Sequence, residues 1–218
     1  DGSGGALEII FSNNIILDDL IIANNTGNYG GGIYFSDALN VTIENLSINN
    51  NFAESAGGIW ISGSSLSLSN SSISNNTAEN NGAGLFITEN SHVEINESVI
   101  SGNILDKYYG GGMIVEQNST ILITNSTISN NIASNLGVFP SYGGGISLIR
   151  SDAIINNSEI SNNSAVGGGG GLHILNGSSL NISNSDISNN VVTHNGAGGG
   201  ILCKTDGDGG INIFLDYI

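Results

Sequence analysis

Basic residues are scarce in this sequence of 218 residues. Lysine and arginine together number three, against 19 acidic residues, so the formal net charge is −16. Proteins that bind nucleic acid or anionic lipid usually do so through clustered Lys and Arg side chains. The composition therefore argues against a nucleic-acid partner and against binding to a membrane surface.

Cysteine and long apolar runs are nearly absent as well. The only cysteine, Cys203, cannot form an internal disulfide, and its position in the repeat described below predicts a buried thiol in the core. No apolar run approaches the ~18 residues of a membrane-spanning helix, so we expect no membrane insertion. Only 10% of residues are charged. A surface built from uncharged Asn, Ser, Thr and Gly favours an extracellular or cell-surface location.

Helical periodicity is missing, and a repeat of about 26 residues takes its place. Each copy begins at the first large apolar residue after a glycine-rich stretch: Leu7, Ile33, Ile59, Leu85, Met113, Ile146, Leu172 and Ile201. A period in the twenties is typical of a solenoid, in which each unit buries its apolar face against its neighbours. Because the repeat covers the whole chain, we expect one domain over residues 1–218.

Within one copy, apolar residues alternate with polar ones. Ile59-Trp60-Ile61 is followed by Leu66-Ser67-Leu68 and then by a single Ile73. Period-two alternation indicates β-strands. The sequence therefore predicts an all-β protein, a single-stranded right-handed parallel β-helix of about eight rungs with three short strands per rung.

Two short motifs mark the start and the end of a rung. Gly-Gly-Ile/Leu/Met opens it at 31–33, 57–59, 111–113, 144–146 and 170–172, and Ile-Ser-Asn-Asn closes it at 73–76, 128–131, 160–163 and 187–190. This pair resembles the repeats of the polymorphic outer-membrane protein family, although Ile stands where that family prefers Phe. The resemblance implies a right-handed β-helix similar to autotransporter passengers and pectate lyases, and a surface role.

Asparagine recurs where the third strand of each copy ends. We expect these side-chain amides to stack as a ladder that satisfies buried backbone groups rather than a ligand. The column consists of Asn25, Asn51, Asn76, Asn103, Asn131, Asn163 and Asn190.

Large apolar residues also occupy outward positions of the first strand. Tyr34, Trp60, Phe86 and Ile114 would form a continuous exposed stripe, and such patches usually mark contacts. A protein interface is the favoured interpretation; a sugar-stacking platform and a loop folded over the stripe are the alternatives. Two insertions at one corner add the candidate loop contacts Tyr108, Tyr109, Phe139 and Tyr142.

No set of residues predicts a catalytic centre, a metal site or a cofactor. The three histidines occupy unrelated positions in the repeat, and Arg150 has no basic neighbour in sequence. Asp206 and Asp208 resemble the start of a calcium loop but lack the remaining ligands, so a plain Gly-Asp turn is favoured. Among the Asn-x-Ser/Thr sequons, those at Asn40, Asn118 and Asn176 are the candidates for glycosylation.

These features predict an extracellular, non-enzymatic structural protein. One hypothesis is head-to-tail self-assembly into a surface filament or sheath, because the apolar first rung lacks a polar cap. An adhesin or passenger domain of a larger protein is the alternative, and a polysaccharide-binding or polysaccharide-cleaving β-helix is the third. The expected partners are copies of the chain itself and, less directly, glycans or cell surfaces.

Overall fold

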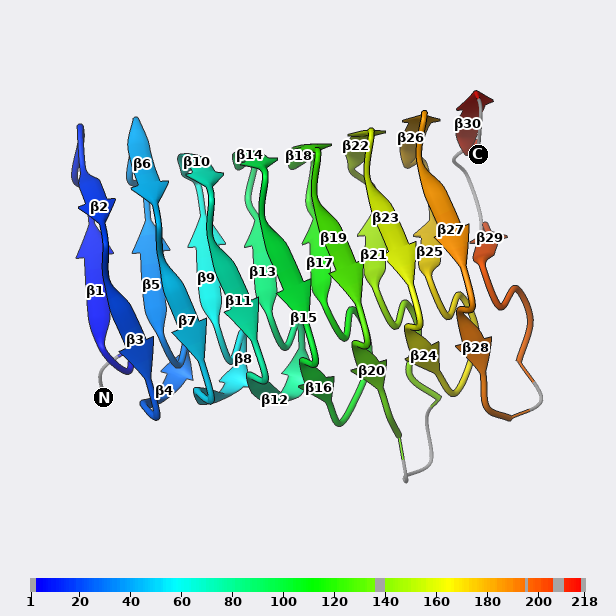
Figure 1. Cartoon of the computed structure of the whole chain (residues 1–218), viewed down its shortest axis with the longest axis horizontal. Coiled ribbons are helices and arrows are strands. Elements are labelled where there is room, and N and C mark those ends of the chain that lie inside the picture. The colour runs from blue at the N-terminus through cyan, green and yellow to red at the C-terminus, as the bar shows by residue number, and fades with distance from the viewer. Residues whose placement is uncertain (1–2, 136–139, 195, 206–209, 217–218) are drawn as a thin grey trace.

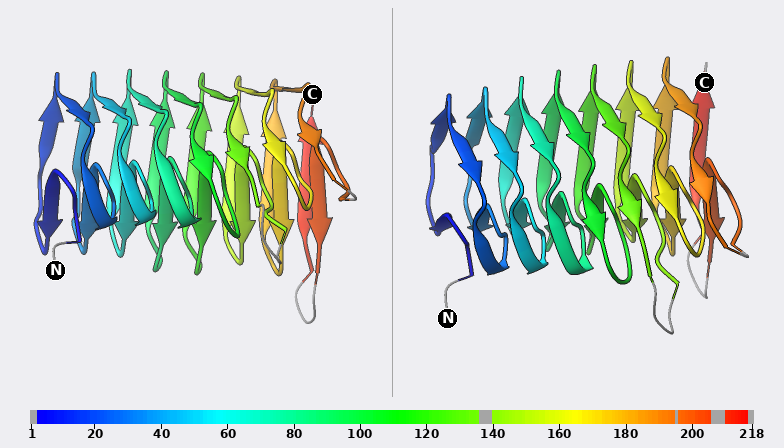
Figure 2. Two further views of the ribbon diagram at one scale, coloured as in Figure 1. Left: turned by 90° about the horizontal axis from the view of Figure 1, so that it is seen from below. Right: turned by 60° about the horizontal axis from the view of Figure 1, so that its bottom comes forward.

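The computed structural model describes residues 3–135, 140–194, 196–205 and 210–216. In these residues the chain winds as a parallel β-solenoid whose turns stack in a straight row (Figures 1 and 2). Equivalent strands of successive turns pair into four parallel sheets. The all-β prediction is confirmed, and the described residues contain no helix that is long and apolar enough to cross a membrane.

The first two sheets contain eight strands each. The first sheet consists of β1 (Leu7–Ile10), β5 (Ile33–Ser36), β9 (Ile59–Ser62), β13 (Leu85–Thr88), β17 (Met113–Glu116), β21 (Ile146–Ile149), β25 (Leu172–Leu175) and β29 (Ile201–Lys204). The second sheet consists of β2 (Ile16–Asp18), β6 (Val41–Glu44), β10 (Ser65–Ser69), β14 (His92–Asn96), β18 (Thr120–Thr124), β22 (Asp152–Asn156), β26 (Ser179–Ser183) and β30 (Asn212–Asp216).

The other two sheets contain seven short strands each. The third sheet consists of β3 (Ile21–Ala23), β7 (Ser47–Asn49), β11 (Ser72–Ser74), β15 (Val99–Ser101), β19 (Thr127–Ser129), β23 (Glu159–Ser161) and β27 (Asp186–Ser188). The fourth sheet consists of β4 (Thr26–Tyr29), β8 (Phe52–Ser55), β12 (Thr77–Asn81), β16 (Ile104–Leu105), β20 (Ile132–Ala133), β24 (Ser164–Ala165) and β28 (Val191–Val192).

The number of strands per turn was predicted incorrectly. Each complete turn of the described residues has four strands rather than the predicted three, and these residues form seven complete turns, followed by β29 and β30 of an eighth. The fourth strand is as short as two residues, as in β16 (Ile104–Leu105). A strand of two residues is too short to show the alternation of apolar and polar residues that distinguishes a strand from a loop in the sequence.

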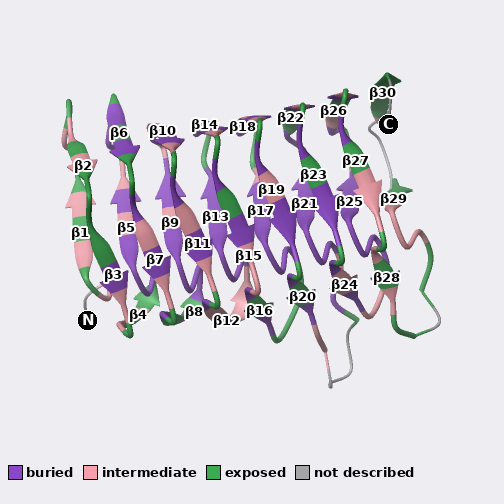
Figure 3. Cartoon of the chain, viewed as in Figure 1, coloured by how far each residue is buried: buried purple, intermediate pink, exposed green. Residues whose placement is uncertain are grey.

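The predicted alignment of the repeats is confirmed by the pairing. Ile33 pairs with Leu7 on one side and with Ile59 on the other, and the same register continues to Leu172 and Ile201. Residues at inward positions, such as Ile33 and Phe35, are fully buried and form one cluster along the axis (Figure 3). The glycine-rich stretches thus set where each turn begins.

The thiol of Cys203 does not lie in the core as predicted. It pairs in register with the buried Ile174, but β29 is the last strand of the first sheet and the residue is exposed. Partial burial raises the pKa of this thiol. A residue at an inward position is buried only when the next turn covers it. Its position in the repeat does not show whether it is covered.

Candidate functional site

The expected asparagine column forms a continuous hydrogen-bonded ladder. The Nδ2 of Asn103 donates to Oδ1 of Asn131 at 2.9 Å and to the Ile73 carbonyl at 3.0 Å. Its Oδ1 accepts hydrogen bonds from the backbone N and from Nδ2 of Asn76. Asn76, Asn103, Asn131 and Asn163 are fully buried. Every polar atom of such an amide is thus used within the solenoid, so the ladder is structural and leaves no group for a ligand.

Two buried serine ladders, which the sequence analysis missed, run parallel to it. At the corner between the second and third sheets, the N–H of Ser71 donates to Oγ of Ser98 at 3.1 Å, and the N–H of Ser98 donates to Oγ of Ser126 at 3.1 Å. Ser64 and Ser91 do the same at the corner between the first and second sheets. The signal was a serine directly after each corner residue, but a short polar side chain at a turn ordinarily points to solvent.

The stripe of outward residues on the first sheet is mostly covered, which corrects the expectation of an exposed patch. Ile114 is fully buried, Phe86 is 6% exposed, and Trp60 and Tyr34 are half-buried. Phe86 and Ile114 pack with Ile149 and Leu175 in a second apolar cluster, which Tyr109 and Trp60 border. The segment that precedes the glycine-rich stretch folds over this face of the sheet, so Phe86 and Ile114 supply stability rather than a docking surface.

Of the candidate loop contacts, Tyr109 and Tyr142 are half-buried, whereas Tyr108 is exposed. Tyr109 and Tyr142 lie at successive bridge positions, with their ring centroids 5.9 Å apart, and both stack on His173. His173 is buried, and its Nδ1 lies 3.2 Å from Oγ of Ser147. Only Tyr108 is exposed as expected, and Phe139 lies outside the described residues.

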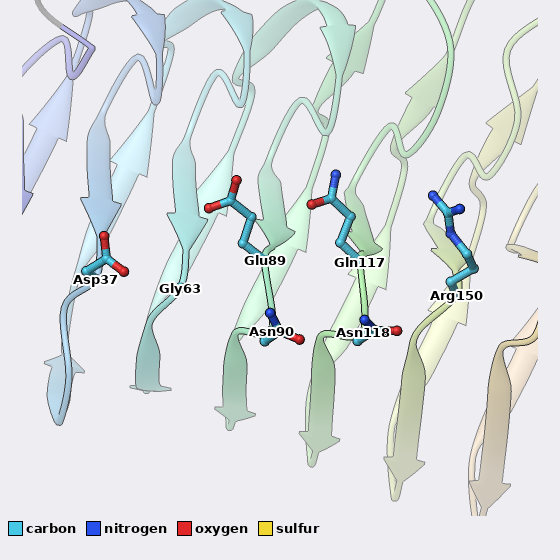
Figure 4. Close-up of a pocket in the computed structure, with 7 residues that line it drawn as sticks. All are labelled: Asp37, Gly63, Glu89, Asn90, Gln117, Asn118 and Arg150. Atoms are coloured by element: carbon cyan, nitrogen blue, oxygen red, sulfur yellow. The ribbon is translucent and has the colours of Figure 1, made fainter.

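A polar cleft lies at the corner between the first and second sheets. It has a volume of about 610 Å³. Five successive turns contribute to its lining, which consists of Asp37, Gly63, Glu89, Asn90, Gln117, Asn118 and Arg150. We call this set the corner groove. Figure 4 shows Asp37, Glu89, Gln117 and Arg150 in one row across neighbouring turns, with Asn90 and Asn118 beside Glu89 and Gln117.

The backbone conformation of the corner explains how these residues come together. All seven have a positive φ between 50° and 59°, as in Asp37 (50°), Glu89 (57°) and Arg150 (51°). The left-handed conformation lets the chain turn sharply between two sheets. Gly63 has no side chain, and Oδ1 of Asp37 lies 2.7 Å from where its Cβ would be. The glycine therefore leaves room between Asp37 and Glu89.

Charge varies along the corner groove. Two carboxylates stand in its first turns and Arg150, the only arginine of the chain, stands in its last. Ser62 donates a hydrogen bond to Glu89, and Ser36 donates one to Asp37 at 3.1 Å. Burial raises the pKa of the neighbouring Glu116, while Arg150 and a hydrogen bond from Thr88 act in the opposite direction. The groove therefore presents carboxylate, amide and guanidinium groups in a fixed order.

A partly exposed aromatic group lies next to the acidic end of the groove. Burial raises the pKa of the Tyr34 hydroxyl, a hydrogen bond with Ser36 acts in the opposite direction, and the charges of Glu89, Glu8 and Asp37 raise the pKa further. Tyr34 lies on β5, three residues before Asp37. Tyr34 stacks on Trp60 with ring centroids 6.2 Å apart, and Tyr29 contacts Trp60 at 5.0 Å. Aromatic faces and a row of polar groups thus adjoin one another.

The corner groove was not predicted from the sequence, because its charged groups are dispersed along the chain. Asp37, Glu89 and Arg150 nevertheless share one position in the repeat. Each is the fourth residue after the first apolar residue of its copy, and those apolar residues are Ile33, Leu85 and Ile146. That common offset was the signal, and it is visible only as a column across the repeats.

The three candidate glycosylation sites lie at corners of the solenoid. Asn40 and Asn118 are exposed at corners with positive φ, whereas Asn176 is half-buried. Many sequons arise from the corner itself, as in Asn125-Ser126-Thr127, where a left-handed Asn precedes a ladder serine and a strand begins. Asp206 and Asp208 lie outside the described residues. Within the described ranges, no three His, Cys, Asp or Glu side chains are grouped so that they could hold a metal ion.

Comparison with known proteins agrees with the architecture. No curated protein and no solved structure matches the chain. A family model described as a right-handed beta helix region matches residues 1–128 and again residues 97–213. Together these matches span nearly the whole chain, and they include the residues that form the parallel sheets, the corners and the ladders. The chain therefore belongs to the right-handed β-helix family.

Proposed function

We propose that the protein is an extracellular, non-enzymatic adhesive rod that binds a glycan chain along the corner groove. The observation that carries this proposal is the groove itself, in which residues from five successive turns line one continuous open cleft. An extended oligosaccharide offers hydroxyl groups at regular intervals. Turns that are ~4.8 Å apart would offer polar partners to them at an equally regular spacing.

The chemistry of the lining supports a carbohydrate. Carboxylates accept hydrogen bonds from hydroxyls, the guanidinium of Arg150 donates them, and the amides of Asn90, Gln117 and Asn118 do both. Tyr34 and Trp60 stand beside the acidic end, where their half-exposed faces could contact a sugar ring. The groove is shallow and open, as suits one side of a chain that continues beyond it.

The rigid interior supports the structural part of the proposal. Asparagine and serine ladders connect neighbouring turns through hydrogen bonds between side chains and backbone, for example Asn103 to Asn131, and Ser64 to Ser91 to Ser119 at the corner that carries the groove. These hydrogen bonds restrain the corner at which the groove lies. The uncharged Asn, Ser and Thr surface suits an extracellular location.

A glycan array with the purified chain, followed by calorimetry on the best oligosaccharide, tests the proposal. The variant Gln117→Gly with Arg150→Gly removes two groove side chains at positions where positive φ suits glycine. We expect it to weaken binding at least about tenfold, since each lost charged hydrogen bond is worth roughly 1.5 to 3 kcal/mol. The control is Asn157→Gly, at an exposed left-handed corner between the second and third sheets.

Two results would contradict the proposal. Binding that survives in the groove variant would place the glycan elsewhere, and failure of every oligosaccharide to bind would remove the glycan from the function. Product analysis of the bound oligosaccharide addresses catalysis separately. We expect it to remain intact, and shortened products would show that the protein is an enzyme.

Assembly of copies into a filament or sheath is the second candidate function. Phe11, Ile16 and Ile21 in the first turn are 80%, 75% and 80% exposed. The outward positions of Ile16 and Ile21 align with the polar Thr42 and Ser47 of the next turn. An apolar group on the outer side of the first turn is unusual on a surface of hydroxyls and amides, and a contact with another copy at this end of the rod would cover it.

Sedimentation of the chain over a range of concentrations tests the filament. Ile16→Lys with Ile21→Lys should abolish large assemblies, while Thr42→Lys with Ser47→Lys in the next turn should not. A wild-type chain that forms no assembly larger than a dimer at any concentration would refute this second candidate.

A further inference from the structure

The outer face of the fourth sheet carries a row of partly exposed apolar side chains. We define the outer row as the residues at the first position of the strands β8 to β28: Phe52, Thr77, Ile104, Ile132, Ser164 and Val191. Phe52 is 38% exposed, Ile104 41%, Ile132 39% and Val191 51%. These strands lie along the lower edge of the solenoid in Figure 1, and several of them are coloured as exposed in Figure 3. No part of the described chain covers this row.

The outer row reads the same in both directions from Phe52 to Val191; Thr26 of β4, which precedes Phe52 in the same column of the sheet, lies outside this pattern. From Phe52 onward the order is a large apolar residue, a hydroxyl residue and an isoleucine, and then an isoleucine, a hydroxyl residue and an apolar residue. The centre of this pattern lies between Ile104 and Ile132, which pair directly in neighbouring turns. A surface that is unchanged by reversal is suited to a second copy of itself that runs in the opposite direction.

Acidic residues beside the outer row are confined to one half of it. We define the flanking row as the residues two positions further along each segment: Glu54, Glu79, Asp106, Ser134, Val166 and Thr193. The first three are acidic and the last three are uncharged. If two copies met in the same direction about this row, like charges would gather on one part of the contact, at a cost for a chain of net charge −16.

We propose that two copies of this chain pair through the fourth sheet with their long axes antiparallel. The two-fold axis would run along the strand direction, midway between β16 and β20. Each residue of the outer row then faces the outer row of the partner at the mirrored turn. Phe52 meets Val191, Thr77 meets Ser164 and Ile104 meets Ile132.

The same operation separates the charges. Glu54 faces Thr193, Glu79 faces Val166 and Asp106 faces Ser134, so no acidic residue of the flanking row meets another. Because both copies have the same spacing between turns, ~4.8 Å, one matched pair aligns all the others. The contact is isologous and closes as a dimer, and it leaves the corner groove, between the first and second sheets, open on both copies.

Analytical ultracentrifugation of the whole chain tests the pairing. We expect a concentration-dependent dimer for the wild type. Ile104→Lys, which places two charges near the two-fold axis, should raise the dissociation constant at least about tenfold. Ser67→Lys is the matched control: it adds the same charge at an outward position of the second sheet, and the dimer should persist.

A charge pair tests the antiparallel direction. Phe52→Asp alone and Val191→Lys alone should each weaken the dimer, and the double variant should recover it. The reason is that the introduced aspartate of one copy would face the introduced lysine of the other only when the axes are antiparallel. The two positions are five turns apart in one chain and cannot pair within it. Failure of the double variant to recover dimerisation would overturn the antiparallel arrangement.

The remaining outcomes separate this proposal from the proposed functions. A wild-type chain that stays monomeric at all concentrations, or a dimer that survives Ile104→Lys, would overturn the pairing. Glycan binding should be unchanged in Ile104→Lys, and the first-turn variant Ile16→Lys with Ile21→Lys should still dimerise. The failure of the dimer is thus distinguishable from the failure of the groove or of the filament.

Discussion

Single side chains hold neighbouring turns together in this protein. A buried amide in the asparagine ladder serves the turn before it and the turn after it at once, as Asn103 does for Asn76, Ile73 and Asn131. Parallel strands joined by tight corners leave backbone groups at each corner without partners in the sheets. The ladders supply those partners in the absence of water.

Asn103→Ala should destabilise the fold by roughly 3 to 5 kcal/mol, because the change leaves several buried donors and acceptors unpaired. The free energy of unfolding in urea measures this. Asn157→Gly is the control, since Asn157 is exposed with a φ of 49° that glycine adopts freely, and it should change stability by less than about 0.5 kcal/mol. Equal losses for the two variants would contradict a special role for the ladder.

The carboxyl group of Glu116 gives the fold a pH dependence. Burial raises its pKa in the folded state, and the positive charge of Arg150 only partly offsets this. A raised folded-state pKa means that the folded state binds the proton more tightly than the unfolded state. The associated stability is complete below the unfolded value of about 4.3 and is lost as the pH rises through the folded pKa.

Glu116→Gln should therefore match the wild type in acid and exceed it at neutral pH. The gain should be less than about 1 kcal/mol, because solvent screens a carboxyl that is only half-buried. Urea unfolding at both pH values measures the difference. A variant that is less stable than the wild type at neutral pH would show that attraction to Arg150 outweighs the cost of burial.

The close stacking of the turns restricts which residue can stand directly before a strand of the first sheet. Gly84 precedes β13, where a Cβ would lie 2.4 Å from the Gly112 carbonyl oxygen and 3.0 Å from Nδ2 of Asn103. The stacked turns leave no space for a side chain there. The glycine-rich stretches are thus explained by close approach of the backbone to the next turn, and no phosphate-binding role is needed.

Gly84→Ala should cost at least about 2 kcal/mol more than Gly177→Ala. Gly177 has a φ of 71° but nothing within 4 Å of its would-be Cβ. Its alanine variant therefore carries only the left-handed strain of about 1 to 2 kcal/mol. Thermal unfolding of both variants provides the comparison, and similar losses would mean that the backbone near Gly84 relaxes easily.

For the whole molecule, electrostatics oppose folding. Nineteen acidic and three basic residues give a large excess of like charge over a narrow stack of turns. Added salt screens this repulsion, since the Debye length falls to about 10 Å at 0.1 M. We expect Tm to rise as NaCl increases from low to physiological concentration. An unchanged or falling Tm would indicate that the acids are already neutralised by local hydrogen bonds, and an uncharged osmolyte is the control for solvent effects.

The repeat by itself determined much of the architecture. The alignment of Ile33 with Leu7 and Ile59, the parallel pairing and the asparagine column all follow from one fact: each turn buries its apolar face only against a copy of itself. The column that contains Asp37 and Arg150 was equally present in the sequence, although it formed no local motif. Residues at the same offset from the first apolar residue of each copy are neighbours in space. Such an offset therefore predicts a group of side chains as well as a local motif does.

Which residues of a strand are covered by another segment follows only from the tertiary structure. The sequence placed Phe86 and Ile114 on an outward face, yet Tyr109 and the segments before the glycines fold over them; it placed Cys203 in an inward column, yet no further described turn covers it. The direction of a side chain is a property of its own strand and can be read from alternation. Its burial depends on a second segment, whose path is set by packing across the turns, and a single column of the sequence carries no information about that path.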